Sequence, residues 1–155
     1  MQECKPLQLD WQATSKSGAV AAGGAEAVAA GLGILERDGN AADAAAATIF
    51  ALNVTDHGAC CIGGEVPLII SSAATRQVKV LAGQGGAPLS AAAIEWYLEN
   101  GIPTSDIKMA PVPAVVDLCI TTLQHYGSKS LEEVVAPTLA LLDMGREEWH
   151  PRLAL

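Results

Sequence analysis

Residues 40–54 read NAADAAAATIFALNV, and this stretch limits the folds that the chain can adopt. Asn40 is a favourable residue for the N-cap of a helix, and Asp43 at the third helical position resembles a capping box and complements the positive end of the helix dipole. From Ala44 to Leu52 the helix is apolar or small on every side, a pattern typical of a helix that is buried all round. A single domain of this size can bury such a helix only by covering it on both sides.

The sequence before this helix predicts a second, amphipathic helix. Small and apolar residues recur there at helical spacing, and they are Ala25, Val28, Ala29, Leu32 and Leu35. The segment Asp38-Gly39-Asn40 should end this helix, with Gly39 as the left-handed residue that follows a helix.

Downstream, the sequence predicts two strands and three helices, at residues 66–70, 77–81, 91–99, 114–126 and 131–144. A short turn separates the two strands, so we expect an antiparallel hairpin. Ser130 and Glu133 form a capping box for the last helix, and Pro137 inside that helix should kink it. The order of elements lacks βαβ alternation, which argues against a doubly wound parallel sheet. It favours an α/β domain of the α+β type, with two helices packed on one face of a mainly antiparallel sheet.

Composition and charge exclude several classes of partner. The 155 residues are enough for one domain, half of them are hydrophobic, and only 4% are aromatic. The formal net charge is −8 and no Lys/Arg cluster occurs, which argues against binding to nucleic acid or to an anionic membrane. Residues 1–17 form a polar lead-in without the apolar region of a secretory signal, so the sequence as written favours a cytoplasmic location.

The cysteines and the motif search indicate no cofactor and no metal site. Cysteines stand at positions 4, 60, 61 and 119, without C-x-x-C or a recognisable zinc spacing. We expect reduced, buried thiols that act as small hydrophobes; the alternative is a disulfide between Cys60 or Cys61 and Cys119. Neither a phosphate-binding glycine loop nor a serine-hydrolase motif occurs.

Three other sets of residues are candidates for a catalytic or metal-binding role. His57 and Cys60 could be imagined as a dyad or a metal pair, but no third partner is in view and a structural loop is the better interpretation. His125 should end a helix, where its charge suits the negative pole. Thr121 and Thr122 lie in mid-helix, whereas an N-terminal nucleophile needs a free α-amine on an exposed strand end. The residues alone therefore show no complete active site.

Four blocks of the chain carry a resemblance to a known family. They are AAGLGILERDGNAADAA at residues 29–45, IGG at 62–64, LAGQGGAPL at 81–89, and residues 112–137 with VPAVV, YG and AP in that order. From Gly18 onward the sequence resembles the gamma-glutamyltransferase (gamma-glutamyltranspeptidase) family. The first and last blocks are specific, whereas the glycine loop alone would be weak.

The resemblance implies part of an N-terminal-nucleophile hydrolase fold, a sandwich of two sheets between helical layers. In that family a precursor cuts itself to expose a threonine, which transfers a gamma-glutamyl group from glutathione or a related amide to water or an amine. The threonine's own amine serves as base, and backbone donors hold the oxyanion. The present sequence stops at Leu155, before the family's cleavage site. The resemblance therefore implies no catalytic residue in this chain, and it implies the remainder of the large subunit and the small catalytic subunit as partners.

The resemblance also singles out one substrate-binding candidate, Gln84. The family arginine that grips the substrate's α-carboxylate aligns with Gln84, and its acidic neighbour aligns with Gly85. Arginine offers a charged, bidentate fork to a carboxylate, and glutamine offers one neutral amide. Ordinary glutamyl recognition should therefore be weakened or changed. The alternative is that Gln84 belongs only to a turn at the end of a strand.

We therefore predict that residues 18–155 form the N-terminal portion of a divergent gamma-glutamyltransferase-like enzyme that acts on gamma-glutamyl or related amides. A non-catalytic binding or scaffolding domain derived from that family is the second hypothesis. An independent small-ligand domain, unrelated to acyl transfer, is the third.

Overall fold

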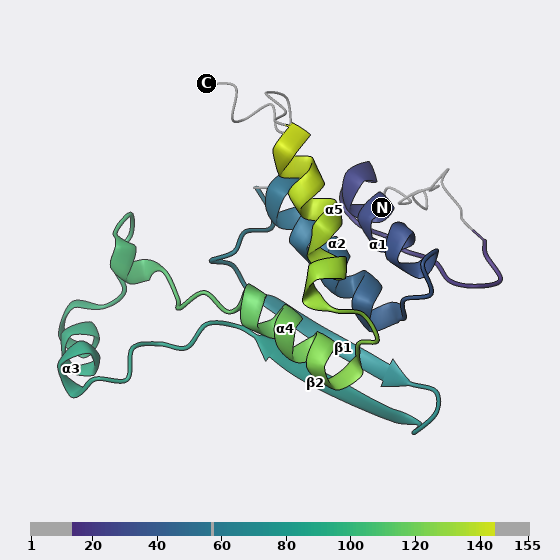
Figure 1. Cartoon of the computed structure of the whole chain (residues 1–155). Helices are drawn as coiled ribbons and strands as arrows, with labels where there is room; N and C mark the ends of the chain where they lie inside the picture. Colours follow the sequence, from purple (N-terminus) through teal and green to yellow (C-terminus); the bar gives the residue numbers. More distant parts are fainter. Residues whose placement is uncertain (1–13, 57, 145–155) are drawn as a thin grey trace, which may run out of the picture.

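The computed structural model describes residues 14–56 and 58–144 (Figure 1). Its elements are α1 (Ala25–Leu35), α2 (Ala41–Thr55), β1 (Val66–Ser72), β2 (Gln77–Gly83), α3 (Ala91–Asn100), the 3₁₀ helix η1 (Ile107–Met109), α4 (Val115–Tyr126) and α5 (Leu131–Met144). All the predicted helices and strands are present. Both strands run two residues further than predicted, and η1 lies in a segment that was predicted as a loop.

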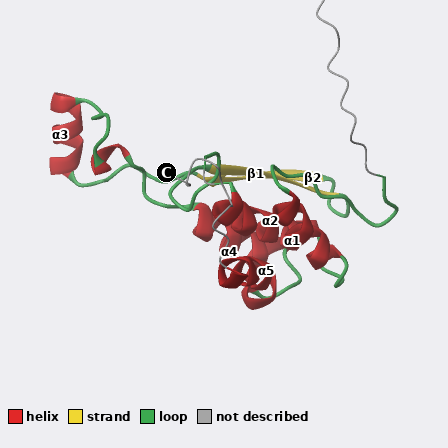
Figure 2. Cartoon of the chain, turned by 90° about the horizontal axis from the view of Figure 1, so that it is seen from above, coloured by secondary structure: helices red, strands yellow, loops and turns green. Residues whose placement is uncertain are grey.

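The two strands form an antiparallel hairpin whose register runs from Val66 opposite Gly83 to Ser72 opposite Gln77. Helices α1, α2, α4 and α5 lie together on one face of this hairpin (Figure 2). Helix α2 is the centre of the helical layer, because it packs against α1, α4 and α5, and α4 also contacts β2. The prediction of helices on one face of an antiparallel sheet is confirmed, but four of the described helices lie there where two were expected (Figure 2).

Helix α2 is covered nearly all round, as its sequence predicts. Residues 42–55 are all buried or half-buried. Ala47 and Ala51 are fully buried, as is Ala27 of α1 opposite them. At Gly31 of α1 a Cβ atom would collide with the Thr48 hydroxyl of α2. Small residues thus allow the two helix backbones to approach closely, which is how a core poor in aromatic residues is packed.

The start of α2 is tied to the end of α4. The capping box of Asn40 and Asp43 is present, and the Asn40 amide also donates to the Tyr126 carbonyl at 2.8 Å. The buried Asp43 carboxylate accepts from the backbone N–H groups of Ser128 and Lys129 and from the Ser128 hydroxyl. Burial alone would raise the pKa of Asp43, but the hydrogen bonds outweigh burial and hold this pKa below its ordinary value of 3.8.

The end of α1 differs from the prediction in one residue. Asp38, and not Gly39, adopts the left-handed conformation, with φ of 60°. Aspartate tolerates this region because its short side chain can bond locally. Gly39 is required for a different reason: its N–H donates to the Ile34 carbonyl at 2.9 Å, and a Cβ atom there would collide with Ile34.

Helix α5 begins with the predicted capping box. The Ser130 hydroxyl accepts from the Glu133 N–H, and the Glu133 carboxylate accepts from the Ser130 N–H. Pro137 lies inside the helix, and the kink remains a prediction. Within the described residues, no helix combines the length and the apolar character needed to cross a membrane.

Candidate functional site

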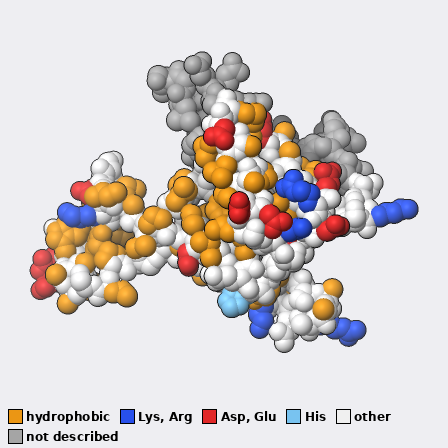
Figure 3. All heavy atoms as spheres, viewed as in Figure 1, with side chains coloured by type: hydrophobic (Ala, Val, Ile, Leu, Met, Phe, Trp, Pro, Cys, Tyr) orange, Lys and Arg blue, Asp and Glu red, His pale blue; other side chains and the backbone are white. Residues whose placement is uncertain are grey.

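Residues 84–114 leave the end of β2 and return to the start of α4 as a projecting arm that carries α3 and η1 (Figures 1 and 2). Its apolar side chains are unusually exposed: Leu89 is 91% exposed, Leu98 is 83% and Ile102 is 77%. Figure 3 shows apolar side chains gathered over this arm. Because large exposed apolar patches mark interaction sites, the arm is the part of the described chain that most needs a partner or a ligand.

Gln84 stands at the base of the arm, opposite Glu65. Glu65 precedes β1 and Gln84 follows β2, so the two residues extend the hairpin register by one position. The Gln84 side-chain Nε2 donates to Oε2 of Glu65 over 3.4 Å, and both side chains are exposed. The sequence analysis did not single out Glu65; the observed register, with Val66 opposite Gly83, places it beside Gln84.

The glycines after Gln84 serve a close approach of two backbone segments. A Cβ atom on Gly85 would collide with the backbone of Val112, and the Val112 N–H points to the Gly86 carbonyl at 3.4 Å. The outgoing and returning segments of the arm therefore touch at its neck. An acidic side chain at position 85, as the family pattern has, does not fit this arrangement unless Val112 moves.

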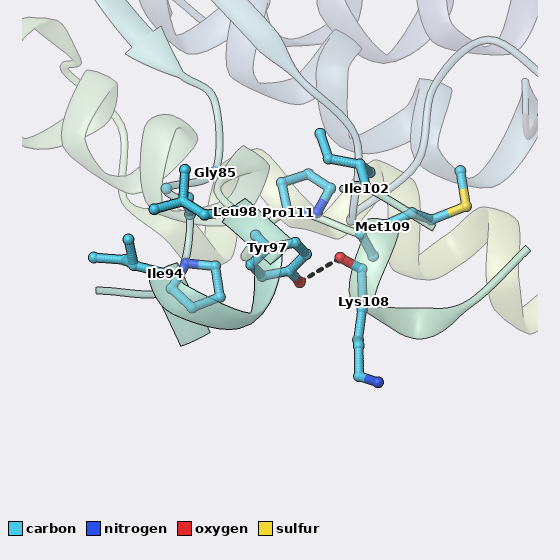
Figure 4. A pocket seen from close by; sticks show the side chains of 12 residues that line it. Gly85, Ile94, Tyr97, Leu98, Ile102, Lys108, Met109 and Pro111 are labelled. Atoms are coloured by element: carbon cyan, nitrogen blue, oxygen red, sulfur yellow. Dashed lines mark hydrogen bonds between the residues drawn. The ribbon is translucent and has the colours of Figure 1, made fainter. Parts of the chain in front are cut away.

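A cavity of about 370 Å³ begins at Gly85 and runs into the arm (Figure 4). Its lining is mainly apolar and includes Pro88, Ile94, Tyr97, Leu98, Ile102 and Met109. Volume and lining both match the usual range of small-molecule sites. Gln84 is adjacent in the chain to this cavity but does not line it.

The polar groups of the cavity wall are already engaged. The Tyr97 hydroxyl donates to the Lys108 carbonyl, and the Lys108 ammonium lies 4.2 Å from the centre of the Trp96 ring. In Figure 4 the Lys108 side chain extends away from Tyr97 and the other labelled side chains. The wall thus presents mainly apolar surface to whatever enters.

The cysteines are only partly as predicted. The thiols of Cys60, Cys61 and Cys119 are free, so neither candidate disulfide is present, and Cys4 lies outside the described residues. Cys119 is buried in α4, but Cys60 is half-buried and Cys61 is exposed, so the prediction of buried thiols was wrong for that pair. Burial, helped by the nearby Cys60, raises the pKa of Cys119 to about 12, which makes it unreactive.

The remaining candidates do not form a site in the described part of the chain. His57 lies outside the described residues, so the pairing with Cys60 is not tested. Thr122 is 1% exposed inside α4 and out of reach of any substrate. His125 lies in the last turn of α4, as predicted. No cluster of three or more potential metal ligands occurs among residues 14–56 and 58–144.

Comparisons with known proteins agree on one family. The family model for gamma-glutamyltranspeptidase matches residues 27–148. A glutathione hydrolase proenzyme of Bacillus subtilis (strain 168) is 30% identical over 136 residues, which are 84% of this chain and 23% of that protein. The chain thus spans about a quarter of the length of this curated relative.

Solved structures give the same result. Gamma-glutamyltranspeptidase of Helicobacter pylori superimposes with a TM-score of 0.71 at 28% identity, over 87% of this chain and 40% of that one. A cephalosporin acylase of Bacillus halodurans reaches the same TM-score, 0.71, at 24% identity, over 97% of this chain and 29% of that one, and shares the fold. The mixed α/β arrangement with an antiparallel pair is therefore part of the N-terminal-nucleophile hydrolase fold, as expected. With a family match over residues 27–148 and a consistent fold, the chain belongs to the gamma-glutamyltranspeptidase family.

Proposed function

We propose that the chain is the N-terminal part of the large subunit of an enzyme that transfers or hydrolyses acyl groups from gamma-glutamyl or related amides. The observation that carries the proposal is the family match over residues 27–148, in a chain that spans 23% of a glutathione hydrolase proenzyme. In this proposal residues 18–155 belong to one domain and residues 1–17 form a lead-in. A threonine nucleophile, released by self-cleavage, comes from polypeptide outside these 155 residues.

The open surfaces of the chain support a partner of this kind. Val66, Leu68 and Ile70 of β1 alternate towards the helices and are half-buried, whereas Ile69 on the other face is 70% exposed. Val80 of β2, on the same outer face, is 69% exposed. A hairpin that is apolar on both faces is suited to lie between two layers. In the proposed enzyme the remainder of the large subunit and the small subunit supply the second layer.

Gln84 is the substrate-binding residue of this proposal. It stands at the position where the family resemblance implies an arginine, and it lies at the mouth of the arm, one residue before the apolar cavity. Its neutral amide can hydrogen-bond a substrate but cannot form a charged fork with a carboxylate.

The test uses the longest polypeptide that the gene encodes. Self-cleavage into two chains on a denaturing gel, together with release of 4-nitroaniline from an acyl 4-nitroanilide, is the expected result. Gamma-glutamyl and simple acyl anilides are both offered as donors. An uncleaved product that releases no nitroaniline from any donor contradicts the proposal.

That negative result would favour the second candidate, a non-catalytic binding or scaffolding domain derived from the family. The specific observation in its favour is that the Gln84 amide already donates a hydrogen bond to Glu65. The amide lies at the position where the family resemblance implies an arginine that binds the substrate. A binding domain of this kind should retain ligand affinity at the arm without any cleavage.

A further inference from the structure

We infer that the site beside Gln84 accepts an uncharged, apolar acyl group and disfavours a carboxylate. The substrates would then be apolar acyl amides, with Glu65 as the residue that excludes an acidic acyl chain. This inference rests on the proposed acyl-transfer function and specifies the substrate class of the same site.

The first observation is the charge beside Gln84. The Glu65 carboxylate lies 3.4 Å from the Gln84 amide nitrogen, so a substrate group that bonds this amide must approach a negative charge. Among the described residues, no lysine or arginine lies within ion-pair distance of Glu65. A carboxylate is therefore repelled at this point, and a neutral group is not.

The second observation is the cavity that begins at the next residue. Gly85 lines a space of about 370 Å³ whose other walls are side chains such as Ile94, Leu98 and Ile102. The hydroxyl of Tyr97 is bonded to the Lys108 carbonyl. The cavity is open, since Ile94, Leu98 and Ile102 are 47–83% exposed. The part of its wall that the structure describes offers a charged group no partner, whereas an alkyl or aryl group would cover apolar surface that water now contacts.

Gly85 connects the two observations. It follows Gln84 directly in the chain. Because it has no side chain, its backbone can lie against the backbone of Val112 and still form part of the cavity wall. The end of an acyl chain that reaches Gln84 therefore also reaches the apolar wall of the arm. An uncharged, apolar chain end suits this position, whereas a carboxylate would face Glu65.

Binding of two matched ligands to the longest polypeptide that the gene encodes tests the inference. Pentanoyl anilide and glutaric acid monoanilide share the acyl chain and the anilide, but the second ends in a carboxylate. ¹⁵N–¹H NMR spectra follow the side-chain amide of Gln84 and the backbone amides of Gly85, Leu98 and Ile102. We expect pentanoyl anilide to shift these signals and to bind about tenfold more tightly than the acid, because a terminal apolar group is buried in place of a charge.

Two variants separate the contributions. Glu65→Gln keeps a hydrogen-bonding group at the position and should narrow the preference for the apolar ligand by about threefold, the size of effect expected at an exposed charge. Leu98→Asn should weaken the binding of pentanoyl anilide by about fivefold, because the cavity loses part of its apolar wall. Leu139→Asn is the control: Leu139 of α5 is 50% exposed, lies outside the cavity lining, and its replacement should leave binding unchanged.

Three results overturn the inference. The first is equal or tighter binding of the acid, the second is a preference that Glu65→Gln does not change, and the third is the absence of any shift at the arm with either ligand. None of these results depends on catalysis, so they are distinct from a failure to self-cleave or to release nitroaniline, which contradicts the proposed function.

Discussion

The Asp43 carboxylate accepts a hydrogen bond from the Ser128 hydroxyl at 2.7 Å and another from the Ser128 N–H at 2.9 Å, although the two residues are 85 positions apart in the chain. Asp43 lies in the first turn of α2, and Ser128 lies in the turn between α4 and α5. One buried carboxylate therefore holds three helices of the layer together.

Replacement of Asp43 by Asn should destabilise the chain. The variant keeps the shape of the side chain but places an N–H₂ group where N–H and O–H donors converge, so at least one buried donor loses its acceptor. We expect a loss of about 2–4 kcal/mol in the free energy of unfolding, measured by urea denaturation. Asp143→Asn, at an exposed position of α5, is the control and should change stability by less than about 0.5 kcal/mol.

The same carboxylate should make stability fall in acid. Because the pKa of Asp43 is lower in the folded chain than its ordinary value of 3.8, the folded state binds fewer protons than the unfolded state in this range. Its contribution is complete above the unfolded pKa and is lost as the pH falls through the folded pKa. The stability difference between the wild type and Asp43→Asn should therefore shrink between about pH 5 and pH 2. A constant difference over this range would show that folding does not lower the pKa of Asp43.

Gly85 and Gly86 form a matched pair for the neck of the arm. A Cβ atom on Gly85 collides with the Val112 backbone, whereas a Cβ atom on Gly86 meets nothing within 4 Å. We expect Gly85→Ala to open the neck and to accelerate hydrogen exchange at the Val112 amide, with a cost of about 1–3 kcal/mol. Gly86→Ala should leave that exchange rate unchanged. Equal effects of the two variants would mean that the two segments do not touch in solution.

Gln84→Arg tests the proposed recognition of donors in the longest gene product. A charged pair with the donor's α-carboxylate should lower the KM for gamma-glutamyl 4-nitroanilide by about fivefold. In the single variant Glu65 competes for the new guanidinium, so Gln84→Arg combined with Glu65→Gln should lower KM further. A KM that neither variant changes removes Gln84 from the substrate site.

The thiols should react in the order of their exposure. Cys61 is exposed, whereas Cys119 is buried and has a pKa raised to about 12. In native chain, mass spectrometry after brief treatment with N-ethylmaleimide should show modified Cys61 and unmodified Cys119. In urea Cys119 should react as well. Labelling of Cys119 under native conditions would mean that α4 detaches from the core.

The periodicity of the sequence was sufficient for the elements of the fold. Helix α2 could be recognised as central because Ala44–Leu52 offers no polar side, and the capping box at Asn40 marked its start. The hairpin followed from two short apolar runs, but the last two residues of each strand were missed. The second strand was predicted to end at Leu81, whereas the structure continues β2 to Gly83 and buries this glycine against Leu118.

The site could be predicted only in part, because its parts come together through long-range contacts. The resemblance pointed to Gln84, but its partner Glu65 lies 19 residues away and becomes its neighbour only through the hairpin register. The contact of Gly85 with Val112 joins the two ends of the arm, and no sequence pattern near either residue predicts it. For the same reason the local sequence pattern did not predict that Asp43 accepts hydrogen bonds from Ser128 as well as from its own helix.

The outer face of the hairpin has a practical consequence for handling the protein. Ile69, Val78 and Val80 project from it with exposed fractions of 63–70%, next to a strand edge that the described residues leave unpaired. In concentrated preparations the hairpin of one copy should therefore stack on the hairpin of another, and the protein should precipitate. Warming should accelerate precipitation, because the attraction between apolar surfaces becomes stronger as the temperature rises. The substitutions Ile69→Thr and Val80→Thr would retain β-branched side chains that favour strands and would make the outer face of the hairpin more polar. The contacts of the hairpin with the helical layer would not change.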